Sequence, residues 1–367
     1  MIKRLSSFII ISIFFVTSTV NAVEIYNKNG NKLRIYGGID QKYNMPYNSK
    51  SVIKKSVQDT GTYILGLLGE TKLNNQLTGY SRLEYKGNDF LSDINEKNDN
   101  DNKISLGLLG LKFGNWNAID YGRKYSIIYD AKALTNRHAF IKTHDVFRKN
   151  DIFLIDRSSN VITYHNYNLF GFSENVTAIL QYQEEYNNKL ITGHGKGWGS
   201  SLKYHNKYGI TAIASWLFEN RTTVQMSDGQ GGNAHAYGLG FKYENDNMYM
   251  AAFYGQGHNI TAYNSDANFA YRSGDVELFG EYDFNCGISS SLSYSESYGK
   301  SIEKINTPIF QDIVVFNKQI NISGHYNFNK KIYTYIDYKL DLLQDDENTQ
   351  THTLHDNILS TGMVYKF

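Results

Sequence analysis

Cysteine and proline are almost absent from this chain of 367 residues. The single cysteine, Cys286, excludes an intramolecular disulfide and a CxxC metal or redox motif. The only prolines are Pro46 and Pro308. Because proline cannot donate a backbone hydrogen bond, its near absence is typical of a chain whose N–H groups mostly enter strand ladders.

The chain also lacks a charge excess and, beyond its first residues, any long apolar run. Its formal net charge of +1 argues against a nucleic-acid binder, which usually carries a strong basic bias. The mean hydropathy is −0.46, and no segment approaches the roughly 20 apolar residues of a spanning helix. A helical membrane protein is therefore excluded. A β-barrel is not, because only alternate strand residues face lipid.

The one clear apolar run, Phe8 to Val16, lies near the start of the chain. It covers about half of a membrane span. Lys3 and Arg4 precede it, and the small-residue site ending at Ala22 follows it, which is the pattern of a secretory signal. We predict that residues 1–22 are removed as a signal peptide and that residues 23–367 form one domain.

Strand signals fill the rest of the chain. Apolar and polar residues alternate with period 2 in the segments 32–40, 77–86 and 332–340, which gives each segment one lipid-compatible face. Aromatic residues make up 14% of the chain, enough to supply interfacial girdles. The segment 359–367 alternates up to Phe367, as the closing strand of a transmembrane barrel does.

The connectors between these strands fall into two size classes. Short ones are expected at 74–76, 205–207, 244–246 and 329–330, and long polar ones at 87–102, 187–198, 222–234, 256–268 and 342–356. Short turns on one rim and long loops on the other are the outer-membrane arrangement. With about 10 residues per strand, the chain accommodates about 16 antiparallel strands. The last should pair with the strand near Leu33. A soluble β-sandwich explains neither the loop asymmetry nor the terminal aromatic residue.

The segment 124–156 interrupts the strand rhythm and is too long for a turn. An inward fold that narrows the lumen and an outward surface loop are both compatible with its periodicity.

The mature chain resembles the general-diffusion porins of enteric bacteria, of the OmpC/OmpF type. The matching stretches, in order, are 23–37, 69–71, 77–80 with 84–85, 110–113, 120–123 with 129–130, 161–164, 170–171 and 365–367. The resemblance implies a trimeric, water-filled, 16-stranded antiparallel barrel with its third extracellular loop folded inward. It also implies that Phe367 is the signal read by the barrel-assembly machinery, and that lipopolysaccharide or other outer-membrane lipid surrounds the barrel.

In that family, basic residues on the wall oppose acidic residues on the loop, and the resulting field sets ion preference. This chain matches only in part. Three wall positions that are basic in the family are occupied here by Gly38, Ile64 and Ser105. The loop positions that are acidic in the family align with Asn136 and Phe140. The candidate constriction residues are Arg82, Glu84, Lys103, Arg157, Tyr125, Tyr129, Asp130, Arg137, Phe140 and Lys142.

The loop itself is basic where the family is acidic. From 135 to 149 it holds four Lys or Arg residues against Asp145 alone, so the resemblance predicts an altered, more basic constriction. A solvated loop surface accounts for the same bias. If the loop enters the lumen, we expect a pore that prefers anions or is nearly unselective, with Arg123–Arg148 largely inside the barrel.

Nothing else in the chain indicates chemistry. His138 with His144, and His352 with His355, lack further ligands at metal spacing, and no nucleophile elbow or phosphate loop is present. We predict a passive outer-membrane channel for small hydrophilic solutes and ions, without enzymatic activity, cofactor or nucleic-acid partner. The alternatives are a substrate-selective channel, a non-conducting surface barrel for adhesion or phage contact, and an outer-membrane barrel enzyme.

Overall fold

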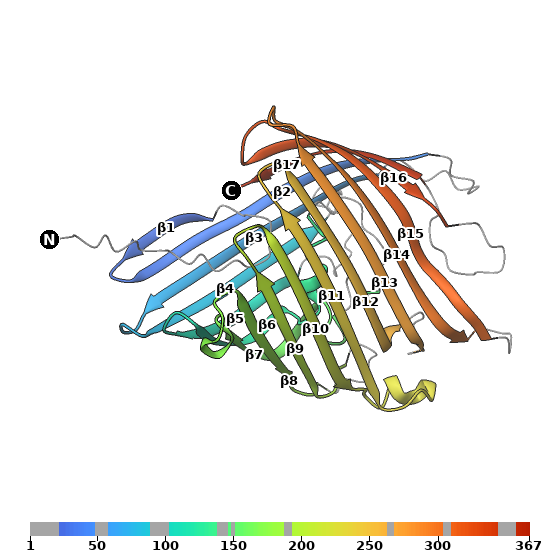
Figure 1. Cartoon of the computed structure of the whole chain (residues 1–367), viewed down its shortest axis with the longest axis horizontal. Helices are drawn as coiled ribbons and strands as arrows, with labels where there is room; N and C mark the ends of the chain where they lie inside the picture. Colours follow the sequence, from blue (N-terminus) through green and yellow to red (C-terminus); the bar gives the residue numbers. More distant parts are fainter. Residues whose placement is uncertain are drawn as a thin grey trace, which may run out of the picture.

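The computed structural model describes residues 22–47, 58–88, 103–137, 146–147, 151–186, 193–262, 268–303, 310–343 and 357–367. In this part of the chain, seventeen β-strands form one sheet (Figure 1). They are β1 (Val23–Lys28), β2 (Asn31–Tyr47), β3 (Gln58–Lys72), β4 (Leu77–Asn88), β5 (Lys103–Phe113), β6 (Asn117–Tyr125), β7 (Arg157–Asn166), β8 (Val176–Gln183), β9 (Gly197–His205), β10 (Ile210–Asn220), β11 (Asn233–Glu244), β12 (Met248–Ala262), β13 (Phe269–Asp283), β14 (Ile288–Glu303), β15 (Phe310–Asn327), β16 (Ile332–Asp341) and β17 (Asn357–Lys366). The helical turns are α1 (Tyr129–Lys132), η1 (Leu169–Gly171) and η2 (Gln225–Asp228), and no helix in the described ranges is long and apolar enough to cross a membrane.

The sheet closes on itself. From β2 to β17 each strand pairs antiparallel with the next, and β17 pairs with β2 from Lys366↔Gly38 to Asn357↔Tyr47. β1 pairs with the remaining part of the same β2 edge, from Val23↔Ile35 to Lys28↔Asn31. β1 therefore continues the line of β17, and the ring has 16 strand positions. The predicted closed 16-stranded antiparallel barrel is confirmed.

Side chains alternate between the two faces of the wall. Leu109 is 70% exposed and Leu278 is 52% exposed on the outer face. Asp275 and Glu277, at the alternate positions of the same strand as Leu278, are at most 5% exposed and point inward, where they meet Lys132. Strand pairings run around the whole ring from β2 to β17 and close at β17–β2, as a spanning barrel requires, and β1 adds to the β2 edge.

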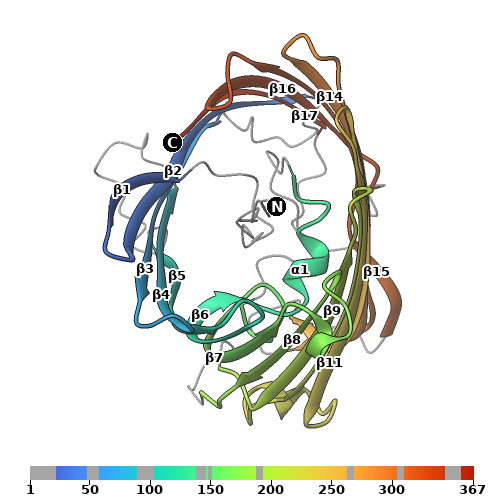
Figure 2. The same ribbon diagram turned by 60° about the vertical axis from the view of Figure 1, so that its left-hand side comes forward.

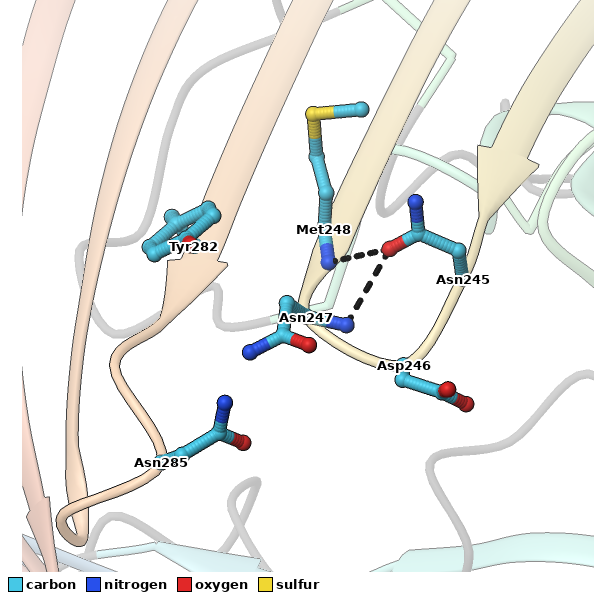
Figure 3. Close-up of a pocket in the computed structure, with 6 residues that line it drawn as sticks. All are labelled: Asn245, Asp246, Asn247, Met248, Tyr282 and Asn285. Atoms are coloured by element: carbon cyan, nitrogen blue, oxygen red, sulfur yellow. Dashed lines mark hydrogen bonds between the residues drawn. The ribbon is translucent and has the colours of Figure 1, made fainter.

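Short connections gather at one end of the barrel, which we call the turn rim. Asparagine side chains close several of these turns: Asn245 Oδ1 accepts from the backbone N–H groups of Asn247 (3.1 Å) and Met248 (2.8 Å). Tyr282 at the end of β13 and Asn285 of the next connection lie beside this turn (Figure 3). Asn206 Oδ1 likewise accepts from Ile210 N. Such side-chain turns explain the Asn-rich clusters of the sequence.

Long connections lie at the opposite end, the loop rim. One predicted loop, 256–268, is wrong in its first part, because residues up to Ala262 belong to β12. Gln256 to His258 pair with β11 and β13 on both sides, so polar composition there reflects the upper barrel wall and not a loop.

Candidate functional site: the inserted segment and the lumen wall

The segment between β6 and β7 provides the only helical turn drawn inside the ring of described strands (Figure 2). Ile127, Ile128, Ala131 and Leu134 are at most 1% exposed and join one apolar cluster with inward-facing wall residues such as Phe253. This packing is close: a Cβ added to Gly240 of β11 would lie 2.8 Å from the Ala131 carbonyl oxygen. Glycine on the inner wall is thus what allows α1 to approach it.

The return half of the segment packs in the same way. Phe153, Leu154 and Ile155 are fully buried, and the Phe153 ring meets Phe269 edge-on at 5.9 Å between centroids. The Leu154 N–H donates to the carboxylate of Glu219 (3.2 Å). Residues 126–137 and 151–156 are therefore attached to the inner wall by an apolar core and by polar ties.

Arg137 shows how far the segment reaches. Its guanidinium lies 3.2 Å from Glu244 and 3.1 Å from Glu281, and it covers the Tyr249 ring at 4.4 Å. Glu244 is the last residue of β11, at the turn rim. Since β6 delivers the chain at the loop rim, the segment crosses most of the depth of the barrel.

Lys132 is the most strongly held residue of the segment. Its ammonium forms ion pairs with Asp275 and with Glu277 (2.9 Å for Glu277), and it lies 4.8 Å from the centre of the Phe253 ring. Thr135 donates to the same Glu277. The Lys132 side chain is only 1% exposed, so both carboxylates and the ammonium depend on one another for compensation.

On the facing wall, the candidate constriction residues Arg82 and Glu84 form an ion pair. The Arg82 guanidinium donates to Glu84 (2.9 Å) and, through Nε, to the Tyr36 hydroxyl (2.8 Å). Tyr36 in turn donates to Glu84 (2.6 Å), and its ring fills the space above Gly66. The sequence analysis did not identify Tyr36. The signal is its cross-strand pairing with Gly66, which leaves room for the ring, and this pairing follows only from the strand register.

Arg157 has carboxylate partners that the sequence did not reveal. It donates to Ser105 Oγ (3.1 Å) and lies 3.6 Å from Asp151 and 3.8 Å from Asp156. Arg123 contacts the other oxygen of Asp151 (2.5 Å). The two acids at the end of the inserted segment therefore neutralise arginines on the wall.

Two candidate constriction residues, Tyr125 and Tyr129, contact each other. The rings of Tyr125 and Tyr129 stack at 3.8 Å between centroids with an interplanar angle of 10°. Burial raises the pKa of Asp130, although the positive charges of Lys203, His165 and Lys124 oppose this shift. Phe140 and Lys142 lie outside the described residues, as does the side chain of Lys103, whose backbone begins β5.

A further polar cluster surrounds Asp120 near the turn rim. Its carboxylate accepts from Tyr80 (2.8 Å) and Lys124, and His165 Nε2 lies 3.1 Å away. No group of three His, Cys, Asp or Glu residues within the described ranges could hold a metal ion. The cluster is a compensated set of wall charges.

Comparison with known proteins decides the class of the molecule. A family model described as Gram-negative porin matches residues 28–367. The chain is a Gram-negative porin. The porin-like protein of Buchnera aphidicola subsp. Schizaphis graminum is 39% identical to it over 368 residues, 98% of each chain, and the outer membrane protein F of Serratia marcescens is 33% identical over the full length of both.

Solved structures agree with this membership. Salmonella typhi OmpF, in complex with daunomycin, superposes on the porin with a TM-score of 0.80 at 27% identity, covering 94% of this chain and all of the other. An anion-selective porin from Comamonas acidovorans shares the fold, with a TM-score of 0.63 at 15% identity. The predicted family, outer-membrane location and passive, non-enzymatic channel function are confirmed.

Proposed function

We propose that residues 126–137 and 151–156 form the constriction of this general-diffusion porin, and that the opposite border of the opening is the wall around Arg82, Glu84 and Arg157. The observation that carries the proposal is the attachment of the segment across the lumen. Lys132 ties it to β13 near mid-wall, and Arg137 ties it at the turn rim. A segment anchored in this way narrows the lumen permanently and sets the size limit for small hydrophilic solutes and ions.

We also propose that the pore is nearly unselective. The described cations among the predicted constriction residues each have a carboxylate partner: Glu84 for Arg82, Glu244 and Glu281 for Arg137, and Asp151 and Asp156 for Arg157. Paired charges a few ångströms apart largely cancel beyond the screening length of about 8 Å at physiological salt. An excess of positive charge, as the more basic constriction requires, would come from Lys142, Arg148 and Lys149, outside the described residues.

Family membership supports three further proposals. A homotrimer is proposed because porins of this family are trimeric channels. Residues 1–22 are proposed as a cleaved signal peptide. Lipopolysaccharide and the barrel-assembly machinery are proposed as partners, the latter through Phe367.

Conductance tests the proposed constriction. We expect stable, ohmic channel steps from the purified porin in planar bilayers, and larger steps after deletion of residues 134–148, because this deletion removes the wall contacts of Leu134 and Arg137. A bulky polymer excluded by the wild-type channel should enter the deleted one. Unchanged conductance and unchanged exclusion would place the constriction elsewhere, and an absence of steps would favour a non-conducting surface barrel.

Reversal potential in a KCl gradient tests the charge balance. We expect a value close to zero for the wild type. Arg137→Ala should shift the preference toward cations, because it removes the positive charge beside Glu244 and Glu281, and the matched Glu281→Gln should shift it toward anions. A clear cation preference that Arg137→Ala combined with Lys142→Ala leaves unchanged contradicts this assignment of the selectivity.

A further inference from the structure

Three tyrosines on the inner wall each donate a hydrogen bond to a carboxylate that lies two strands away around the ring. The three pairs, with the distance between their oxygen atoms, are Tyr36 with Glu84 (2.6 Å), Tyr80 with Asp120 (2.8 Å) and Tyr335 with Asp40 (3.0 Å). All three hydroxyls point in the same direction around the barrel, from β16 to β2, from β2 to β4 and from β4 to β6. We call these three hydrogen bonds the tyrosine bridges.

Each tyrosine bridge crosses a glycine on the strand between its two ends. The cross-strand pairs are Tyr36 with Gly66, Tyr80 with Gly110, and Tyr335 with Gly362. A Cβ added to these glycines would lie, in the same order, 2.0, 2.5 and 2.4 Å from the Cζ atom of the tyrosine. Because neighbouring strands are about 4.8 Å apart, the backbone of the acidic residue is about 10 Å from that of the tyrosine. The hydroxyl reaches the carboxylate only because the ring lies over a residue that has no side chain.

The tyrosine bridges occupy one continuous stretch of the wall, from β16 through β17 and β2 to β6. Alternation places their residues on the inner face: Tyr335 is 2% exposed, whereas its neighbour Ile336 is 54% exposed. In Figure 2, β2 to β5 lie across the lumen from α1, which packs on β10 and β11. The bridges therefore hold carboxylates on the side of the wall that faces the inserted segment.

Asp40 depends most strongly on its bridge. The other two carboxylates also form ion pairs, Glu84 with Arg82 and Asp120 with Lys124. Within the described part of the chain, the Tyr335 hydroxyl is the one hydrogen-bond donor to Asp40, and Asp40 forms no ion pair. Positive charges act on it at longer range, from Lys42, Lys366 and Lys86. The place of this carboxylate is thus set by a single hydroxyl group.

We propose that Tyr36, Tyr80 and Tyr335 are positioning residues for ion permeation, which hold three carboxylates at fixed places on the lumen wall. A hydroxyl donor stabilises the negative charge of the carboxylate that accepts its hydrogen bond. A carboxylate held in this way attracts cations and repels anions within the screening length of about 8 Å at physiological salt. The inference rests on the proposed role of lumen charges in ion preference, but not on the proposed place of the constriction.

Reversal potential in a KCl gradient tests the bridge of Tyr335 in the mature porin. Tyr335→Phe keeps the ring over Gly362 and removes only the hydroxyl. We expect this variant to shift the preference toward anions, in the same direction as Asp40→Asn and by no more than that variant. The double variant should show the shift of Asp40→Asn alone, because Tyr335 acts through Asp40 and the two substitutions are therefore not additive.

Tyr298 supplies a matched control on the outer face of the wall. Its ring also lies over a glycine, Gly274, where an added Cβ would lie 2.5 Å from the Tyr298 Cζ atom. Tyr298 alternates with the buried Ser297, which points inward to Asp275. Among the described residues, no carboxylate accepts a hydrogen bond from the Tyr298 hydroxyl. Tyr298→Phe removes an equivalent hydroxyl and should leave the reversal potential unchanged.

Four results overturn the proposal: an unchanged reversal potential in Tyr335→Phe, an unchanged one in Asp40→Asn, an equal shift in Tyr298→Phe, or a shift by Tyr335→Phe that persists when Asp40 is already asparagine. The last result would assign the effect to packing of the ring. The wild-type value tests a different statement. A clear ion preference of the wild type contradicts the proposed charge balance of the pore, whereas the differences between variants still decide the role of the tyrosine bridges.

Discussion

Replacing Lys132 by alanine is expected to release the inserted segment from the barrel wall. The substitution leaves Asp275 and Glu277 buried without their ammonium partner, and removal of one member of a buried ion pair costs about 3–5 kcal/mol. We expect a loss of this size in the free energy of unfolding in urea, measured in lipid vesicles. Single-channel records should show larger current fluctuations, because the segment is held at its middle by this contact.

A matched variant separates charge from packing. Lys132→Met combined with Asp275→Asn and Glu277→Gln removes all three charges together, and replacing a complete buried ion group by neutral residues is often close to neutral in stability. The triple variant should therefore recover most of the lost free energy of unfolding, and its current fluctuations should return toward those of the wild type. If Lys132→Ala is as stable and as quiet as the wild type, the ion group does not anchor the segment. If the triple variant is as unstable as the single one, packing of the lysine stem is responsible.

The barrel could be predicted from the sequence because its pattern is local. Strand alternation at 77–86 and 332–340 depends only on which side chains meet lipid, and this requirement is the same at every strand. The pattern predicted a first strand at 32–40 and did not predict the separate β1 before it. Asn29 and Gly30 adopt positive φ values of 54° and 78°, so the chain turns there, and a separate β1 joins the line of β17.

The charge partners of the constriction could not be predicted, because they depend on how deeply the segment enters the lumen. Lys132 and Asp275 are 143 residues apart, and Arg137 meets Glu244 from another strand. A count of Lys and Arg residues along the segment cannot include wall carboxylates whose register is unknown. Arg82 and Glu84 were named through the family resemblance, and their contact agrees with alternation, because residues two apart lie on the same face of a strand.

The closure of the barrel depends on a single junction at the end of the chain. The Phe367 N–H donates to the Gly37 carbonyl (3.0 Å), and the Gly37 N–H donates to the Phe367 carbonyl (3.1 Å). The Phe367 ring occupies the space beside Gly37, where an added Cβ would lie 2.6 Å from the ring and 2.6 Å from the Ile64 carbonyl oxygen. This residue therefore joins β17 to β1 along β2 through both its backbone and its side chain.

Deleting Phe367 should prevent efficient formation of the closed barrel. The deletion leaves both polar backbone groups of Gly37 unpaired in the wall, at a cost of several kcal/mol each where lipid excludes water. The yield of heat-modifiable barrel after refolding into vesicles should fall strongly. Phe367→Ala keeps the backbone bonds and loses only the ring, so it should refold to a higher yield than the deletion. If Phe367→Ala refolds well in vesicles but does not reach the outer membrane in cells, the assembly machinery recognises the aromatic ring. Wild-type refolding of the deletion variant contradicts the structural role, because the same two hydrogen bonds are absent whichever route the chain takes into the membrane.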